Sequence, residues 1–140
     1  MRNMVGNFNV TLPPSTKTIL LGLLLCIFFS VPLFAGDPPP AVQAEVAHLL
    51  DYIDNSGCRF WRNGSWYDAH QARAHLELKY RYLCKKGGVL STEDVIELIG
   101  SRSSLSGKPY EIKCGDTAPV FTGDWLRQEL SRFRERESKS

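Results

Sequence analysis

The sequence predicts one α+β domain in which about four helices pack against a small antiparallel sheet that includes an Asn-Gly hairpin. Three observations lead to this fold class. Apolar residues recur at helical spacing in several separate segments, an Asn-Gly pair lies between two short aromatic segments, and glycine or proline residues separate these blocks. Helices and strands do not alternate along the chain, which argues against a parallel βαβ array. The length of 140 residues suits a single domain.

The N-terminal segment is typical of an export signal. Residues 19–34 form an uncharged apolar run, with Lys17 before it and Ala35 after it. A membrane-spanning helix needs about 20 apolar residues, whereas a signal peptide has a shorter run, a basic flank and a small-residue exit. We expect residues 1–35 to be a signal peptide cleaved after Ala35, and the protein to be periplasmic or secreted. Because Leu33 is large for its position before the cleavage site, retention as an N-terminal anchor in the inner membrane is the alternative.

Removal of this segment leaves a chain without net charge. The whole sequence has 17 Lys and Arg against 15 Asp and Glu, and Arg2 and Lys17 are the only charged residues before Gly36. Nucleic-acid-binding proteins concentrate basic residues to neutralise phosphates, so we expect no nucleic-acid partner. We expect a small ligand or an envelope protein as the partner, and no stable membrane insertion after cleavage. The oligomeric state stays open.

Export makes disulfides possible, and the cysteines suggest one bridge. Cys26 leaves with the signal peptide, and Leu25 before it does not fit a lipidation motif. Cys58 ends a helix-to-strand connection and Cys114 lies in a predicted strand, whereas Cys84 lies in the last turn of a predicted helix. We therefore favour a Cys58–Cys114 disulfide, with three free thiols as the alternative. No pair has Cys-x-x-Cys spacing, so neither a redox motif nor a zinc site is predicted.

The mature chain is expected to begin with a proline-rich leader, residues 36–40, which cannot be helical because proline lacks an amide hydrogen and restricts the residue before it. Residues 41–55 are predicted to form the first helix, with Gly57 as its stop. The residues expected to line its buried face are Val42, Val46, Leu49, Leu50 and Ile53.

Residues 58–62 and 65–67 are predicted to form a β-hairpin. They flank Asn63-Gly64, which indicates a two-residue type I′ turn because both central residues need a positive φ. Alternation along the first strand places Phe60 and Arg62 on one face and Trp61 on the other. We therefore expect at least one aromatic side chain of the hairpin to be accessible to solvent.

Two helices are expected to follow the hairpin. Asp68 and Gln71 have the spacing of a capping box, which predicts a helix over residues 68–86. A shorter helix is predicted from Ser91 to Gly100. The residues expected to form the buried stripe of the longer helix are Ala72, Leu76, Tyr80 and Leu83.

The C-terminal part is expected to return to the sheet and end in a helix. Residues 101–109 read as a loop, residues 110–114 as a strand, and residues 120–121 as its neighbour. Asp124 is expected to cap a last helix that ends near residue 134, followed by a charged, disordered tail over residues 135–140. The single domain is thus predicted to span residues 41–134.

Several blocks of residues together resemble a known family. The blocks are Ser56-Gly57-Cys58 with Phe60 and Arg62-Asn63-Gly64, then Ala72 with His75-Leu76 and Lys79, then Ser103-Ser104 with Ser106-Gly107-Lys108-Pro109-Tyr110, and finally Trp125-Leu126. In this order and at these separations, the mature chain resembles the YfeK-like family of short exported proteobacterial proteins, a domain of unknown function. The resemblance implies an exported single domain, and it implies no activity, cofactor or catalytic residue.

A group of polar residues is the candidate ligand site. His75 and Lys79 are four residues apart and share one helix face, and Arg62 can join them if the hairpin packs beside that helix. Such a cationic pocket suits a carboxylate, a sugar acid or a peptide terminus. A structural role for these residues is the alternative. The candidate ligand-binding residues are Arg62, Asn63, His75, Lys79, Ser104, Ser106, Lys108 and Tyr110.

The sequence predicts a non-catalytic binding or interaction module for a small anionic or cell-envelope ligand or a protein partner. The alternative is a small periplasmic hydrolase that uses His75 with a loop serine, but no third group that would orient the histidine is identifiable. The other histidines, His48 and His70, do not have metal-ligand spacing with His75. We therefore expect neither a metal nor a cofactor.

Overall fold

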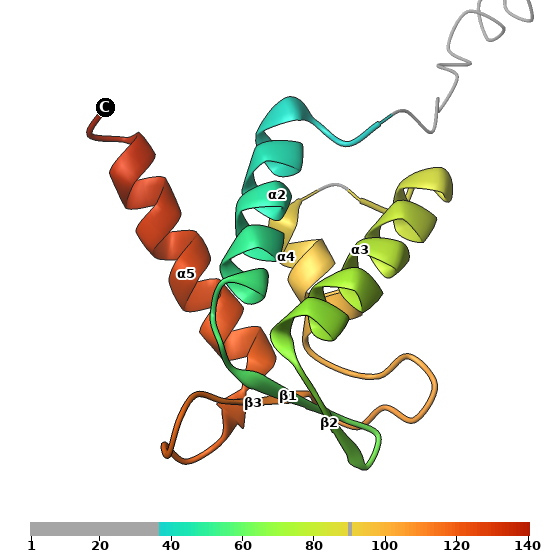
Figure 1. Cartoon of the computed structure of the whole chain (residues 1–140). Coiled ribbons are helices and arrows are strands. Elements are labelled where there is room, and N and C mark those ends of the chain that lie inside the picture. Colours follow the sequence, from blue (N-terminus) through green and yellow to red (C-terminus); the bar gives the residue numbers. More distant parts are fainter. Residues whose placement is uncertain (1–36, 90) are drawn as a thin grey trace, which may run out of the picture. The chain divides into compact units, whose positions relative to one another are not determined.

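The computed structural model describes residues 37–89 and 91–140, and it confirms the α+β fold class (Figure 1). The predicted signal peptide, residues 1–35, and Gly36 of the leader lie outside the described residues. The elements are α2 (Pro40–Asp54), β1 (Arg59–Arg62), β2 (Ser65–Tyr67), α3 (Ala69–Lys85), α4 (Thr92–Val95), the π-helical turn η2 (Ile96–Gly100), β3 (Glu111–Lys113), β4 (Val120–Phe121) and α5 (Thr122–Glu137).

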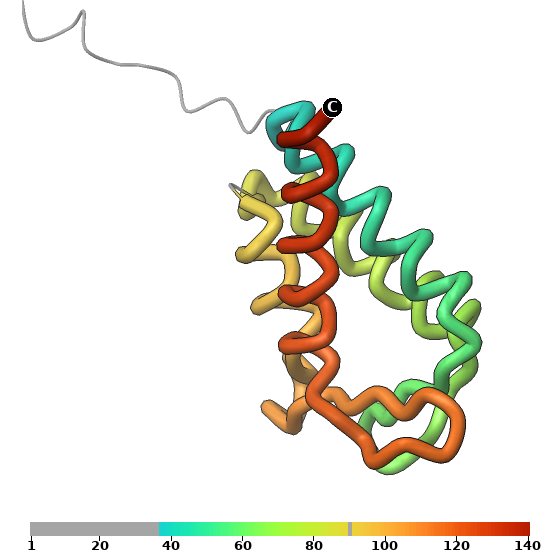
Figure 2. The backbone as a smooth tube through the Cα atoms, turned by 90° about the vertical axis from the view of Figure 1, so that its left-hand side faces the viewer, coloured from blue at the N-terminus to red at the C-terminus, as the bar shows by residue number. Residues whose placement is uncertain are grey.

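The strands form one antiparallel sheet in the order β2-β1-β3-β4, and the helices lie on one side of it (Figure 1). The tube in Figure 2 shows α5 running alongside the α4–η2 segment, with α2 and α3 side by side behind it. None of the helices in the described ranges is long and apolar enough to cross a membrane.

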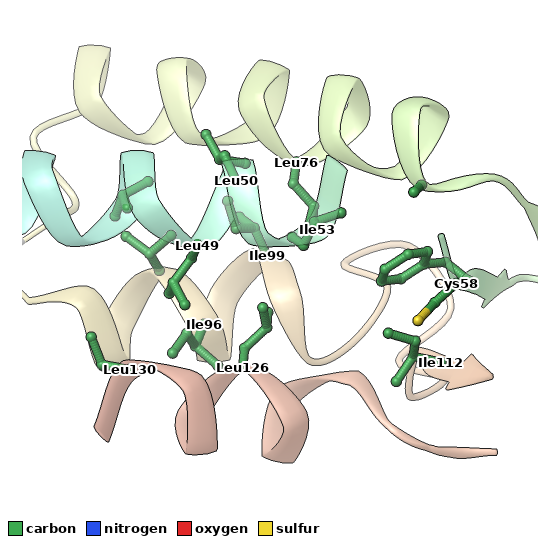
Figure 3. Close-up of a cluster of buried hydrophobic side chains, with 14 of the residues drawn as sticks. Leu49, Leu50, Ile53, Cys58, Leu76, Ile96, Ile99, Ile112, Leu126 and Leu130 are labelled. Carbon is green, nitrogen blue, oxygen red and sulfur yellow. The ribbon is translucent and has the colours of Figure 1, made fainter. Parts of the chain in front are cut away.

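The hydrophobic core lies between the helices and extends to the sheet (Figure 3). Leu49, Leu50 and Ile53 of α2 are buried, as their helical spacing predicts, and they point toward the other helices. Ile112 of β3 and Cys58 extend the core to the sheet. The other labelled core residues in Figure 3 are Leu76, Ile96, Ile99, Leu126 and Leu130.

The pairing register sets which side chains face the helices. Phe60 lies opposite both Tyr67 and Ile112, and Arg62 lies opposite Ser65. Asn63 and Gly64 connect β1 to β2 with φ angles of 50° and 96°. Directly opposed residues share a face, so Phe60 and Tyr67 lie on the helix side of the sheet.

The predicted disulfide is confirmed. Cys58, just before β1, is bonded to Cys114, just after β3. The bond closes a loop of 56 residues, which in the chain-entropy model stabilises the folded state by about 4 kcal/mol. Cys84 is a free, partly buried thiol in the last turn of α3.

The predicted helix starts are confirmed at two caps, whereas other boundaries differ. Asp68 and Ser91 both make reciprocal capping boxes, with Gln71 and Asp94 as partners. Pro40 was expected in a non-helical leader, but it is the first residue of α2. Proline is tolerated there because the first helical amides have no partner within the helix.

The last helix is longer at both ends than predicted. It begins at Thr122, two residues before the expected cap at Asp124, and it includes residues 135–137 of the segment that we expected to be a disordered tail. Arg134 holds this end against α2, because it pairs with Glu45, and Arg136 pairs with Glu129 within α5. The Arg134–Glu45 pair is tertiary, so the charge pattern of the tail alone does not reveal it.

Glu129 is the centre of an ion cluster between α2 and α5. Its side chain is buried, and it lies 2.8 Å from His48, 2.8 Å from Arg132 and 3.0 Å from Arg136. Burial raises the pKa of this carboxyl, but hydrogen bonds from the three basic groups outweigh burial and lower the pKa to about 2. His48 therefore has a structural partner, and it also stacks on Phe133.

Candidate functional site

A pocket opens between the β1–β2 hairpin and the first half of α3. Its empty volume is about 370 Å³, part of which is open to solvent. Tyr110, just before β3, and Thr122, the first residue of α5, complete its wall. The lining residues are Phe60, Trp61, Arg62, Tyr67, Gln71, Ala72, His75, Leu76, Tyr110 and Thr122.

The start of α5 is brought to the pocket by a close helix contact. Gly123 lies against the residue that follows the π-helical turn, and a Cβ at this position would clash with the side chain of Ser101. The backbone amide of Thr122 donates to the carbonyl oxygen of Tyr110 at 3.0 Å. This contact and this hydrogen bond place Thr122 beside Tyr110 in the pocket wall.

Arg62, His75 and Lys79, here called the basic cluster, come together as the sequence predicts for a hairpin beside α3. The guanidinium carbon of Arg62 lies 4.7 Å from the ring centre of Tyr67. The Nζ atom of Lys79 lies 5.7 Å from the ring centre of Tyr110. His75 lies one helical turn before Lys79 and lines the pocket together with Arg62.

The basic cluster has no acidic partner in the part of the chain that the structure describes. None of the ion pairs there includes Arg62 or Lys79. The Nζ atom of Lys79 is buried and has no hydrogen-bond partner among the described residues. A buried cation without an acceptor is costly, since the ammonium loses its hydration and gains only the contact with the ring of Tyr110.

The charges of the basic cluster act on one another. Burial lowers the pKa of His75, and the positive charges of Arg62 and Lys79 lower it further. Burial also lowers the pKa of Lys79, with Arg62 as the second cause. The imidazole of His75 is therefore neutral at pH 7, because its ordinary pKa of about 6.5 is already below that value.

Two tyrosines frame the basic cluster, and their pKa values move in opposite directions. Interaction with the Arg62 guanidinium lowers the pKa of Tyr67. Burial raises the pKa of Tyr110, against the smaller opposing influences of Arg62 and Ser103. The guanidinium of Arg62 thus lies over the ring of Tyr67, and the ammonium of Lys79 lies over the ring of Tyr110.

Thr122 adds a second unpartnered polar atom. Its side chain is 1% exposed, and its Oγ1 atom is buried without a hydrogen-bond partner among the described residues. Because Thr122 lines the pocket, this buried hydroxyl belongs to a residue of the pocket wall. Sequence reasoning missed Thr122, since only the packing of α5 against the loop after η2 brings it to the hairpin.

The loop residues of the predicted site lie apart from the pocket lining. Asn63 donates to the hydroxyl of Ser103 at 3.2 Å and accepts from the hydroxyl of Ser106 at 2.7 Å. Ser104 and Lys108 are exposed, and neither lines the pocket. The structure thus groups Arg62, His75, Lys79 and Tyr110, and it places Asn63 and the loop in a separate hydrogen-bonded unit.

Other pocket residues had a usable signal in the sequence. Tyr67 follows from the hairpin register, since it lies opposite Phe60. Gln71 precedes His75 by four residues and therefore shares its helix face. Within the ranges that the structure describes, no group of three or more His, Cys, Asp or Glu side chains can hold a metal ion.

Comparison with known proteins places the chain in a family. No curated protein and no solved structure matches the chain. A family model does match: it covers residues 40–134, which include every element from α2 through most of α5 and therefore the whole pocket. The chain belongs to DUF5329, a family of unknown function.

Proposed function

We propose that the protein binds a small anionic ligand at the pocket lined by Arg62 and His75 of the basic cluster, without converting it chemically. The single observation that carries this proposal is the buried Nζ atom of Lys79, one helical turn beyond His75, which has no hydrogen-bond partner among the described residues and feels the positive charge of Arg62. An anion beside Arg62 would compensate its charge and reduce its repulsion of Lys79. A protein that keeps such an uncompensated group gives up stability at that site, and this is typical of functional sites.

Binding has more support than hydrolysis. A serine or cysteine hydrolase needs a nucleophile within hydrogen-bond reach of the catalytic base. Among the described residues, the hydrogen bonds include none to the ring of His75, and the hydroxyls of Ser103 and Ser106 are engaged with Asn63. We therefore do not assign His75 a role as a base.

We also propose that the protein works outside the cytoplasm, in the periplasm of a proteobacterium, as the YfeK-like resemblance implies. The N-terminal basic flank, the apolar run of residues 19–34 and the exit at Ala35 support export. The Cys58–Cys114 disulfide is compatible with it, since such bonds persist in oxidising compartments. The ligand would then be a small molecule of the envelope or an anionic group on an envelope protein.

Titration of the purified protein with small anions, followed by NMR of the backbone amides, tests the binding proposal. Sodium acetate and sodium phosphate are added separately, and sodium chloride at equal ionic strength is the control. We expect saturable shifts at residues of the pocket with acetate, phosphate or both. In the Lys79→Met variant these shifts should be lost or need at least tenfold more ligand.

The matched control is Lys85→Met, the same substitution on the same helix at an exposed position. This variant should bind as the unmodified protein does. If neither acetate nor phosphate causes more change than chloride, or if both substitutions weaken binding equally, the pocket is not an anion site and the proposal is wrong.

A further inference from the structure

The walls of the pocket are largely apolar. Phe60, Ala72 and Leu76 line it, together with the rings of Tyr67 and Tyr110, while Arg62 and His75 supply its basic side chains. Small-molecule sites generally combine apolar walls with a few placed polar groups that orient the ligand. A fully hydrophilic anion would leave these walls facing water and would use only part of the pocket.

The pocket lining matches a single negative charge. Arg62 is the one permanent cation among the lining residues, His75 is neutral at pH 7, and Lys79 lies outside the lining. The guanidinium carbon of Arg62 lies 4.7 Å from the ring centre of Tyr67, and its planar group can donate two parallel hydrogen bonds. A carboxylate has the planar, two-oxygen geometry that accepts both, and a phosphate dianion would bring more charge than Arg62 compensates.

Thr122 supplies a neutral group for the same ligand. Thr122 lines the pocket, and its buried Oγ1 atom has no hydrogen-bond partner among the described residues. A hydroxyl that is 1% exposed and unpaired has a cost that a ligand oxygen would remove. Among the described residues, Thr122 is thus a pocket-lining residue with an unsatisfied polar atom.

We infer that the ligand is a small monocarboxylate with an apolar or aromatic body, held by Arg62 at the carboxylate, with the apolar body against Phe60, Ala72 and Leu76. This inference rests on the proposed function, and it adds the chemical class of the ligand. The enclosed space is only about 40 Å³ and the pocket is partly open to solvent, so a small ligand would fit with part of its body exposed.

Four probes separate the charge from the apolar body: phenylacetate, acetate, phenylacetamide and inorganic phosphate. Their dissociation constants are measured by the same NMR titration at pH 7.5. Phenylacetate should bind at least about tenfold more tightly than acetate, because the ring leaves water. Phenylacetamide has the ring without the charge, so it should bind at least tenfold more weakly than phenylacetate. Phosphate should also bind more weakly than phenylacetate.

Two substitutions test the pocket residues. Ala72→Leu fills the apolar wall and should weaken phenylacetate at least tenfold while changing acetate much less, and the exposed Ala74→Leu on the same helix is its control. Thr122→Val keeps the shape and removes the hydroxyl. It should weaken phenylacetate severalfold without lowering the melting temperature, since no hydrogen bond is lost in the unliganded protein.

The outcomes distinguish the two levels of the argument. If acetate binds as tightly as phenylacetate, or phosphate binds more tightly, the monocarboxylate class is wrong while the anion site stands. If phenylacetamide binds as tightly as phenylacetate, the pocket recognises the ring alone and the inference fails. If no anion binds at all, the proposed function itself is wrong.

Discussion

Replacing Lys79 with methionine should make the unliganded protein more stable. The ammonium is buried without an acceptor, and leaving a buried polar group unsatisfied costs about 1–3 kcal/mol. Methionine keeps a long unbranched side chain and has no charge to bury. The substitution also removes the contact of Nζ with the face of Tyr110, which is worth about 0.5–1 kcal/mol. The net expectation is a gain of about 1 kcal/mol in the free energy of unfolding.

Urea denaturation at pH 7.5 measures this difference directly. A gain of about 1 kcal/mol should also raise the melting temperature by about 4–8 °C in a domain of this size. The control Lys85→Met removes an exposed charge near the C-terminal end of α3, so it should be neutral or destabilising by up to about 0.5 kcal/mol.

The pH dependence gives a second readout of Lys79. Its pKa in the folded state is lowered by burial and by Arg62, so the unfolded state binds more protons as the pH approaches the ordinary lysine value. The folded protein therefore gains stability relative to Lys79→Met as the pH rises from 8 toward about 10.4, and the advantage of the variant should shrink. If Lys79→Met loses more than about 1 kcal/mol at pH 7.5, the ammonium is net stabilising and our reading of the pocket is refuted.

Three further predictions concern stability. Glu129→Gln should lower the free energy of unfolding at pH 7 by about 1–2 kcal/mol. The shift in the pKa of Glu129 from 4.5 to about 2 corresponds to about 3 kcal/mol, and solvent screening of the two arginines reduces this value. This loss should narrow as the pH falls from 4.5 toward 2, and an equal loss at pH 7 and pH 2.5 in urea titrations would refute the ion-cluster account. The protein should lose stability relative to His75→Gln as the pH falls from 7.5 to 5. The pKa of His75 is lowered in the folded state, so the unfolded state binds the proton first. An equal difference in urea midpoint between the two proteins at both pH values would contradict this. Reduction of the Cys58–Cys114 bond by dithiothreitol should cost about 2–4 kcal/mol, measured as a lower urea midpoint, and an unchanged midpoint would show that the bond is energetically neutral.

Much of the fold follows from short-range rules that the sequence displays directly. The caps at Asp68 and Ser91 involve residues three positions apart, and the buried stripe of α2 follows from helical spacing. Asn63-Gly64 has the positive φ angles that its residue types favour. The grouping of His75 with Lys79 is equally local, since a helix places residues four apart on one face.

The sequence by itself therefore determined the fold class, most helix starts and half of the basic cluster, because these depend on backbone preferences and on spacing within one element. Only the tertiary structure decided that Thr122 joins the pocket, that Arg134 holds the last turns of α5 against α2, and that Ser106 belongs with Asn63. Each of these contacts joins residues far apart in the chain. Such contacts depend on how whole elements pack, and no local pattern of charge or hydrophobicity encodes that packing.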